Sequence, residues 1–218
     1  MAISDTYNCD CMGFMRGMPD GAFGLCIADP PYGIGGKGCF SSAGKLGKRI
    51  MGTADTLWDR QRPPQALFDE LFRVSRNVII WGGNYFDLPP TRCVVVWDKC
   101  QPWDNLSQVE LAWTSFEHPA RLFRYDTRSG GSKIHPTQKP VALYAWLLRR
   151  FANKGDIIFD PMMGSQSSRI AAYHLGFDFV GCELDAGYYR EGCARFDREC
   201  MGVTVCKGVK VKQLSLGL

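Results

Sequence analysis

Short apolar runs that end in turn residues are the feature that most constrains the fold of this chain. The runs are rich in β-branched or aromatic residues, and all but the run at 109–115 stop at a Gly or an Asp, which is typical of strands that are buried on both faces of a sheet. They therefore predict a sheet core rather than a helical bundle. The runs lie at 22–28 (AFGLCIA), 77–81 (NVIIW), 93–97 (CVVVW), 109–115 (VELAWTS), 156–160 (DIIFD) and 177–185 (FDFVGCELD).

Helical patterns alternate with these runs. Pro63 and Pro64 precede apolar residues at helical spacing (Leu67, Phe68, Leu71 and Phe72), Pro140 opens a second helix through Phe151, and SSRIAAYHL is a third, closed by Gly176. This alternation predicts an α/β fold with a mostly parallel, doubly wound sheet. The tail from Met201, with VTV and VKV, predicts a short strand pair.

Length and composition indicate one globular domain. The chain has 218 residues, of which 45% are apolar and 22% charged, and this excludes wholesale disorder. It has no apolar run long enough to span a bilayer, and residues 1–11 lack the features of a secretory signal. Its ten cysteines form no Cys-x-x-Cys pair, so we expect reduced thiols and no metal site.

Basic residues are concentrated in two segments. Residues 33–62 contain six Lys or Arg and two Asp, and residues 119–139 contain five Lys or Arg and one Asp. Each segment therefore carries +4, which equals the net charge of the whole chain, so the remainder carries −4. Two basic segments on an acidic body are typical of a surface that binds a polyanion, although two solvated loops would have the same composition.

A turn of small residues joins the run at 156–160 to the helix that follows it. We call residues 160–168 (DPMMGSQSS) the small-residue turn. It lets a ligand approach the backbone near a helix N-terminus, and Glu183, 23 residues after Asp160, can accept the hydroxyls of a ribose. The spacing indicates a cofactor that contains adenosine, and a plain structural turn remains the alternative.

Two further segments carry polar groups on rigid backbone. The Asp-Pro-Pro-Tyr turn (residues 29–32) ends a buried strand, and its carboxylate, carbonyl and ring suit a flipped-out base held by its amino group. A rigid turn with a packed tyrosine is the alternative. The HPTQKP segment (residues 135–140) projects Thr137 and Lys139, and His135 in it is expected to be a hydrogen-bonded spacer rather than a base.

Together these segments resemble one family. ADPPYGIG, then IHPTQKP, then FDPMMGSQSS closely resembles the adenine-N6 and cytosine-N4 DNA methyltransferases of the permuted β group, in which the catalytic motif precedes the cofactor motif. The resemblance covers nearly the whole chain and is greatest to small phage and prophage adenine methylases. It implies a circularly permuted, seven-stranded-type methyltransferase sheet in a single domain, with DNA-contacting inserts at about 33–62 and 98–134.

The resemblance also implies roles for matched residues. Asp29 and the Pro30 carbonyl would accept the hydrogens of the target amine, Pro31 completes the turn, and Tyr32 would stack on the base. S-adenosylmethionine is the implied cofactor, without a metal. The residues assigned to it are Asp10, Cys11, Asp29, Thr137, Lys139, Asp160, Pro161, Met163, Gly164, Ser165, Gln166, Glu183 and Leu184; those assigned to DNA are Lys37, Lys45, Lys48, Arg49, Arg124, Arg128 and Lys133.

One residue departs from the family pattern. Gln166 stands where the family has the second glycine of Gly-Ser-Gly, so its side chain could crowd the cofactor or its backbone could be strained. We expect weakened rather than abolished cofactor binding.

The expected activity is direct methyl transfer to adenine N6 of double-stranded DNA. Asp rather than Ser at position 29 favours adenine over cytosine. Cytosine-N4 transfer, and a methylase-like DNA-binding protein that has lost turnover, are the alternatives. We expect a cytoplasmic protein of a bacterium or a phage-infected host, with no membrane contact, and a homodimer is left open.

Overall fold

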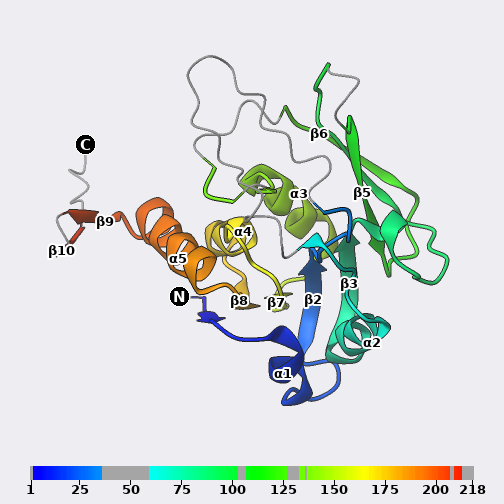
Figure 1. Cartoon of the computed structure of the whole chain (residues 1–218), viewed down its shortest axis with the longest axis horizontal. Helices are drawn as coiled ribbons and strands as arrows, with labels where there is room; N and C mark the ends of the chain where they lie inside the picture. Colours follow the sequence, from blue (N-terminus) through cyan, green and yellow to red (C-terminus); the bar gives the residue numbers. More distant parts are fainter. Residues whose placement is uncertain are drawn as a thin grey trace.

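An eight-stranded sheet forms the centre of the protein (Figure 1). The structure is a computed structural model and describes residues 2–35, 59–102, 107–126, 133–135, 137–206 and 209–212. Its strands are β1 (Ser4–Tyr7), β2 (Phe23–Ala28), β3 (Ser75–Trp81), β4 (Val95–Asp98), β5 (Val109–Thr114), β6 (Arg121–Arg124), β7 (Ile157–Asp160) and β8 (Asp178–Cys182).

The strand order is β1-β8-β7-β2-β3-β5-β4-β6. From β1 to β3 every pairing is parallel, β5 runs antiparallel to both β3 and β4, and β6 is parallel to β4. The prediction of a mostly parallel α/β sheet is therefore confirmed. The sheet has eight strands where the resemblance implied a seven-stranded type.

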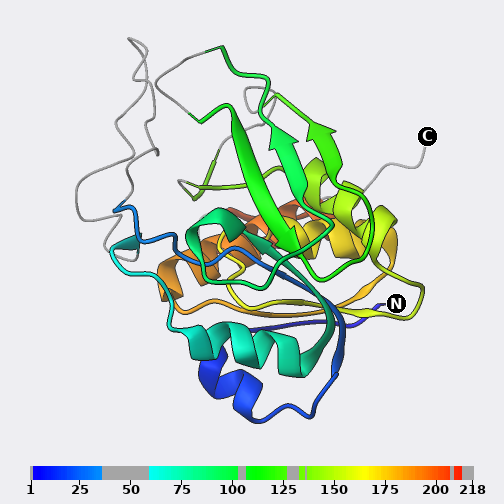
Figure 2. The ribbon, with the colours of Figure 1, turned by 90° about the vertical axis from the view of Figure 1, so that its right-hand side faces the viewer.

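Helices cover both faces of the sheet, as Figures 1 and 2 show. One apolar cluster joins α3 and α4 to side chains such as Leu25, Ile79 and Phe179, and the other joins α1 and α2 to Cys26, Val78 and others. All six residues of β2 are buried, because both of its faces are covered. The helices are α1 (Cys11–Arg16), α2 (Gln65–Val74), α3 (Val141–Phe151), α4 (Ser167–Leu175) and α5 (Ala186–Cys200).

The helix ends follow the predicted signals. Pro64 and Pro140 lie at the N-caps of α2 and α3, one residue before the first helical position, and Gly176 ends α4 in the left-handed conformation that suits glycine. The predicted tail pair is present as β9 (Val203–Cys206) and β10 (Val209–Lys212), which are antiparallel and lie beyond α5 in Figure 1.

The elements that were not predicted include α1, α5 and β6. The helix α1 is short and contains a glycine, α5 is rich in charged residues, and β6 is an edge strand that begins and ends with arginine, so none has a strong apolar pattern. Two stretches of the segment 98–134, β5 and β6, are strands of the main sheet.

The state of the cysteines and the length of the helices can be compared with what the composition predicted. The eight cysteines whose side chains the structure describes are free, and Cys26, Cys93 and Cys182 are fully buried as small apolar side chains. Among the described helices, none is both long and apolar enough to cross a membrane.

Candidate functional site

The carboxyl ends of β2 and β7 bring the two predicted corners of the site together. These strands are parallel neighbours, with Cys26 opposite Phe159, so Asp29 and Asp160 emerge at the same edge of the sheet although 131 positions separate them. Two cavities open at this edge, and Asp29, Thr137 and Lys139 line both. The Asp-Pro-Pro-Tyr turn and the small-residue turn therefore lie at the same edge of the sheet, as a single site built from both turns requires.

The larger cavity has a volume of about 610 Å³, which is within the range of small-molecule sites. It lies between the loop after β1, the HPTQKP segment, the small-residue turn and the start of α5. The residues expected from sequence that line it are Asp10, Cys11, Asp29, Pro31, Thr137, Lys139, Pro161, Met163, Gly164, Ser165, Glu183 and Leu184.

Glu183 is held firmly in the wall of the larger cavity. One carboxylate oxygen accepts the N–H of Gly164 at 2.8 Å, and the other accepts the N–H of Asp185 at 2.8 Å. Burial nevertheless raises the pKa of this carboxyl. Since each oxygen keeps a second lone pair, the fixed carboxylate can accept two hydroxyl groups from a ligand.

Asp10 and Leu184 lie on the rim of the same cavity. The Asp10 carboxylate caps α1 by accepting the N–H groups of Met12 and Gly13, which fixes its position. Leu184 is 72% exposed, unusual for a leucine, and its surface faces the cavity opening. A fixed acid and an exposed apolar side chain together suit the polar edge and the ring face of a purine.

Asp160 differs from its expected role, because its carboxylate lies inside the small-residue turn. It accepts the N–H of Met162 at 3.0 Å and the hydroxyl of Ser168 at 2.5 Å, and it is not among the residues that line either cavity. Asp160 therefore stabilises the conformation of the turn without facing either cavity. Burial raises its pKa to about 7 from an ordinary value of 3.8.

This shift predicts a pH-dependent stability. The folded protein holds a proton on Asp160 up to about pH 7, whereas the unfolded chain releases it near pH 3.8, so the contribution of Asp160 to stability falls as pH rises between these values. We expect the free energy of unfolding of Asp160→Asn, relative to wild type, to rise by about 1.4 kcal/mol per pH unit in this window. Denaturant unfolding at several pH values measures this, with the exposed Asp69→Asn as control. Parallel curves for wild type and D160N would contradict it.

Gln166 also differs from its expected place. Its φ of 58° lies in the left-handed region, as the missing glycine predicts, but its side chain is fully buried and does not line the larger cavity. It points to α5 instead, where it packs against Gly192 and donates to the carbonyl of Tyr189 at 3.4 Å, while Arg169 donates to it at 2.9 Å. The side chain therefore does not crowd a ligand.

We expect Gln166 to matter for stability rather than for the cofactor. Gln166→Gly loses the buried contacts but relieves the left-handed strain, and Gln166→Ala loses the same contacts without that relief. The alanine variant should therefore be less stable than the glycine variant by about 1 kcal/mol. Thermal unfolding measures this difference, and calorimetry should give both variants the wild-type affinity for S-adenosylmethionine within about threefold. A tenfold change in affinity would place Gln166 in the binding site after all.

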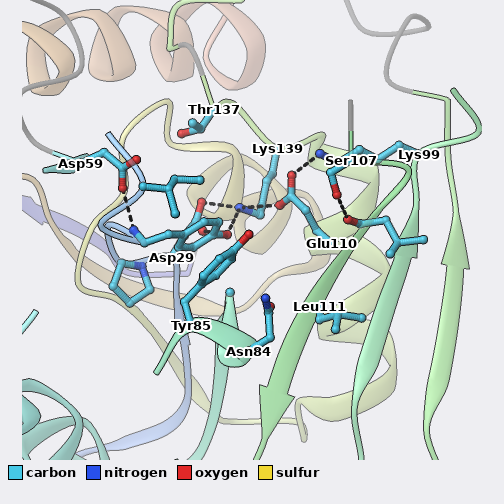
Figure 3. A pocket seen from close by; sticks show the side chains of 15 residues that line it. Asp29, Asp59, Asn84, Tyr85, Lys99, Ser107, Glu110, Leu111, Thr137 and Lys139 are labelled. Atoms are coloured by element: carbon cyan, nitrogen blue, oxygen red, sulfur yellow. Dashed lines mark hydrogen bonds and ion pairs between the residues drawn. The ribbon is translucent and has the colours of Figure 1, made fainter. Parts of the chain in front are cut away.

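The smaller cavity, of about 280 Å³, lies on the other side of Asp29 (Figure 3). It is lined by the Asp-Pro-Pro-Tyr turn, by β5 and by the 3-10 helix η2 (Gly83–Tyr85). Pro30 and Tyr32 line this cavity whereas Pro31 lines the larger one. The turn therefore separates the two cavities.

Both oxygens of the Asp29 carboxylate have partners. Oδ1 accepts the hydroxyl of Tyr32 at 2.8 Å, and Oδ2 accepts the ammonium of Lys139 at 2.5 Å. Burial raises the pKa of Asp29, and the ammonium of Lys139 opposes this shift. Asp29 thus has a stronger affinity for protons than an exposed carboxylate.

Lys139 points toward Asp29 and Glu110 rather than toward the far end of the larger cavity. Its side chain is only 3% exposed, and its ammonium lies between Asp29 and Glu110, with Glu110 Oε2 at 3.2 Å. A second ammonium, of Lys99, pairs with the other oxygen of Glu110. Burial alone would raise the pKa of Glu110, but the two ammonium groups outweigh burial and lower it to about 2.

The ring of Tyr32 is packed from several sides. It stacks on Tyr85, with centroids 5.0 Å apart and planes at 16°, and its edge lies against Gly82, where a Cβ would collide with it. Asp59 fixes the backbone below the ring by accepting the N–H groups of Tyr32 and Gly33. Tyr32 is therefore held in place before any ligand arrives.

Sequence reasoning did not find several of these residues. Glu110 and Lys99 belong to the β4–β5 pair, Asn84 and Tyr85 to η2, and Asp59 to the edge of a basic segment. No local motif marks them, because their place depends on how the sheet pairs. An acid within a strand, as in VELAWTS, was the one available signal for Glu110.

His135 makes a local hydrogen bond of the kind expected for a spacer. Its ring lies edge-on to Tyr188 at 4.3 Å, and its Nδ1 accepts the N–H of Thr137 at 3.3 Å. Burial lowers the pKa of this imidazole to about 4, so it is neutral at physiological pH.

Only two of the residues assigned to DNA are described. Arg124, on β6, is largely exposed and pairs with Asp98 at 3.2 Å, and Lys133 is exposed. Lys37, Lys45, Lys48, Arg49 and Arg128 lie outside the described residues.

Comparisons with known proteins agree with this geometry. A family model described as DNA methylase, for the N6/N4 group, matches residues 80–193. The YubD protein of Escherichia coli K12, which is named as a methylase, is 24% identical over 212 residues and covers 85% of this chain and 87% of YubD. The type II methyltransferase M.HpaI of Haemophilus parainfluenzae is 37% identical over 70 residues, which are 32% of this chain but only 22% of M.HpaI.

Solved methylase structures share the fold. The M1.HpyAVI–SAM complex has a TM-score of 0.59 at 18% identity, covering 88% of this chain and 98% of that one. The cytosine-N4-specific PvuII DNA methyltransferase has a TM-score of 0.60 at 14% identity, covering 89% and 87%. TTHA0409 of Thermus thermophilus, solved with S-adenosyl-L-methionine, has a TM-score of 0.55 at 16% identity, covering 99% and 100%.

Proposed function

The chain belongs to the N6/N4 family of DNA methylases, and from this premise we propose that it transfers a methyl group from S-adenosylmethionine to the exocyclic N6 of adenine in double-stranded DNA. The observation that carries the proposal is that two cavities meet at Asp29. The larger has the acids and apolar surface that a nucleoside cofactor needs, and the smaller has the carboxylate and aromatic ring that an everted base needs.

The larger cavity fits the cofactor. Glu183 would accept the ribose hydroxyls, Asp10 would accept the adenine amine, and the backbone of Gly164 and Ser165 leaves room for the methionine part. The main evidence for this fit is that both Glu183 oxygens are already fixed toward the cavity by backbone N–H groups. Bound there, S-adenosylmethionine supplies a methyl group on a positively charged sulfur.

The smaller cavity would prepare the amine. An exocyclic aromatic amine is a poor nucleophile because its lone pair is delocalised into the ring. Asp29 and the Pro30 carbonyl would accept its two N–H groups and draw the nitrogen toward a tetrahedral geometry, with the lone pair facing the larger cavity. As the bond from nitrogen to the methyl carbon forms, the methyl carbon–sulfur bond would break and S-adenosylhomocysteine would leave. Asp29 would stabilise the positive charge that develops on the nitrogen until the amine loses a proton to solvent, so that positioning and electrostatics supply most of the acceleration.

Adenine is proposed because Asp29 stands at the first position of the turn, where the resemblance associates Asp with adenine. Cytosine-N4 transfer is the second candidate, because the cytosine-N4-specific PvuII enzyme has the same fold. Both bases present an exocyclic amine next to a ring nitrogen, so the same carboxylate could hold either.

Identification of the methylated base tests the proposal. The protein is incubated with duplex DNA and S-adenosylmethionine labelled in the methyl group, and the DNA is digested to nucleosides. We expect label in N6-methyl-2′-deoxyadenosine. Label in N4-methyl-2′-deoxycytidine supports the second candidate, and binding of DNA and cofactor without single-turnover transfer supports a methylase-like binding protein.

The basic segments supply the proposed DNA contacts. Residues 33–62 follow the Asp-Pro-Pro-Tyr turn directly, so their lysines and arginines would lie against phosphates beside the everted nucleotide, and those of about 98–134 would add further contacts. We propose one catalytic domain that carries both segments. Such an enzyme would act where DNA is, in the cytoplasm of a bacterium or a phage-infected host, and its dimeric state stays a prediction.

A further inference from the structure

The target amine would find the Asp29 carboxylate already engaged. Its two oxygens accept from Tyr32 and from Lys139, so the N–H of the amine must compete with these donors for the carboxylate. Tyr32 is held in place by Gly82, by Tyr85 and by the backbone anchors of Asp59. The Lys139 ammonium has a second acceptor at hand, because Glu110 Oε2 lies 3.2 Å away.

We propose that Glu110 is a positioning residue that takes the Lys139 ammonium from Asp29 when the target amine enters. The inference deepens the proposed function and rests on it. The ammonium needs no new partner and only a small movement, since it already contacts both carboxylates. Asp29 Oδ2 is thereby released for the N–H of the amine.

The charges of the cluster support this role. Lys99, Glu110, Lys139 and Asp29 form a chain of alternating charges that sums to zero (Figure 3). Lys139 is almost fully buried, so its ammonium requires a carboxylate wherever it lies. Without the charge of Glu110 the ammonium would stay on Asp29, and the cluster would carry an extra positive charge beside a nitrogen that becomes positive.

Glu110→Gln tests this, because glutamine keeps the size of the side chain and removes its charge. We expect kcat/KM for methyl transfer to DNA to fall about 100-fold. The affinity for S-adenosylmethionine should stay unchanged, because Glu110 does not line the larger cavity. The matched control is Glu117→Gln, an exposed residue just beyond β5, which should have wild-type activity.

The pH profile separates positioning from a merely structural role. Glu110 raises the pKa of Asp29 and Lys139 lowers it, so removal of the Glu110 charge should move the acid limb of kcat/KM to lower pH. The groups that face Asp29 from the surrounding elements are Lys139, Tyr32, Glu110, Tyr144 and Asp160.

Lys99→Met provides a second variant with the opposite expectation. Without Lys99, Glu110 has one cation left and should hold Lys139 more strongly, which frees Asp29 and moves the acid limb to higher pH. This variant also tests the inference if Glu110→Gln does not fold, since it leaves the pairs of Lys139 with Asp29 and with Glu110 in place.

The outcomes are distinguishable. Acid limbs that shift in opposite directions, with unchanged cofactor affinity, support the inference. An active wild type with acid limbs unmoved in the folded variants would overturn the role of Glu110 and leave the proposed function standing. A wild type that transfers no methyl group to DNA would overturn the proposed function itself.

Discussion

Asp29→Asn should lower kcat for DNA methylation by about 10³-fold while the protein still binds S-adenosylmethionine. Asparagine keeps the shape of the side chain but has no negative charge, and it offers one acceptor oxygen in place of two. The donors Tyr32 and Lys139 would compete with the target amine for that oxygen. The positive charge that develops on the amine would also lose its nearest compensating charge.

Single-turnover transfer of a labelled methyl group to duplex DNA measures this effect. Calorimetry with S-adenosylmethionine on the same preparation shows whether the larger cavity is intact. The exposed Asp87→Asn is the matched control and should behave as wild type. If Asp29→Asn keeps more than about one tenth of the wild-type rate, Asp29 is not the group that holds the amine.

Glu183→Ala should raise the Kd for S-adenosylmethionine by about 100-fold. The variant loses the acceptors for the ribose hydroxyls, and it also releases the N–H groups of Gly164 and Asp185 that shape the cavity. Hydrogen bonds to a charged group contribute about 1.5 to 3 kcal/mol each, so two of them account for a loss of this size.

A graded series makes this prediction sharper. Glu183→Gln keeps one acceptor oxygen and the side-chain volume, so we expect an intermediate loss of about tenfold. Glu191→Ala, an exposed acid on α5, is the control and should bind as wild type. Calorimetry that gives Glu183→Ala an unchanged Kd would remove Glu183 from the cofactor site.

The strands of the core could be predicted because each contains a run of apolar residues. In β2 and β3 the local pattern and the tertiary environment agree, so the run of buried residues marks each strand. The edge strand β6 and the charged helix α5 could not be found this way. Their stability comes from neighbours that the local sequence does not indicate.

The residues of the site can likewise be divided into those that the sequence indicated and those that required the structure. Glu183, Gly164 and the Asp-Pro-Pro-Tyr turn follow directly on strands, so a motif and its strand were enough to find them. Gln166 was recognised as a departure, and its left-handed φ agrees with one of the two expected consequences. The direction of its side chain, into α5 and away from the cavity, required the structure.

The sequence by itself determined the sheet core, the two turns and the order in which they occur, because each depends on residues close together in the chain. Only the tertiary structure decided that Lys139 faces Asp29 and Glu110, and that Asp160 lies behind its turn. A buried charged side chain pairs with an opposite charge on a neighbouring strand, and the pairing of the strands decides which residue that is. The pairing of β5 with β3 brings Glu110 to the cavity, and nothing local to residue 139 or residue 110 encodes that pairing.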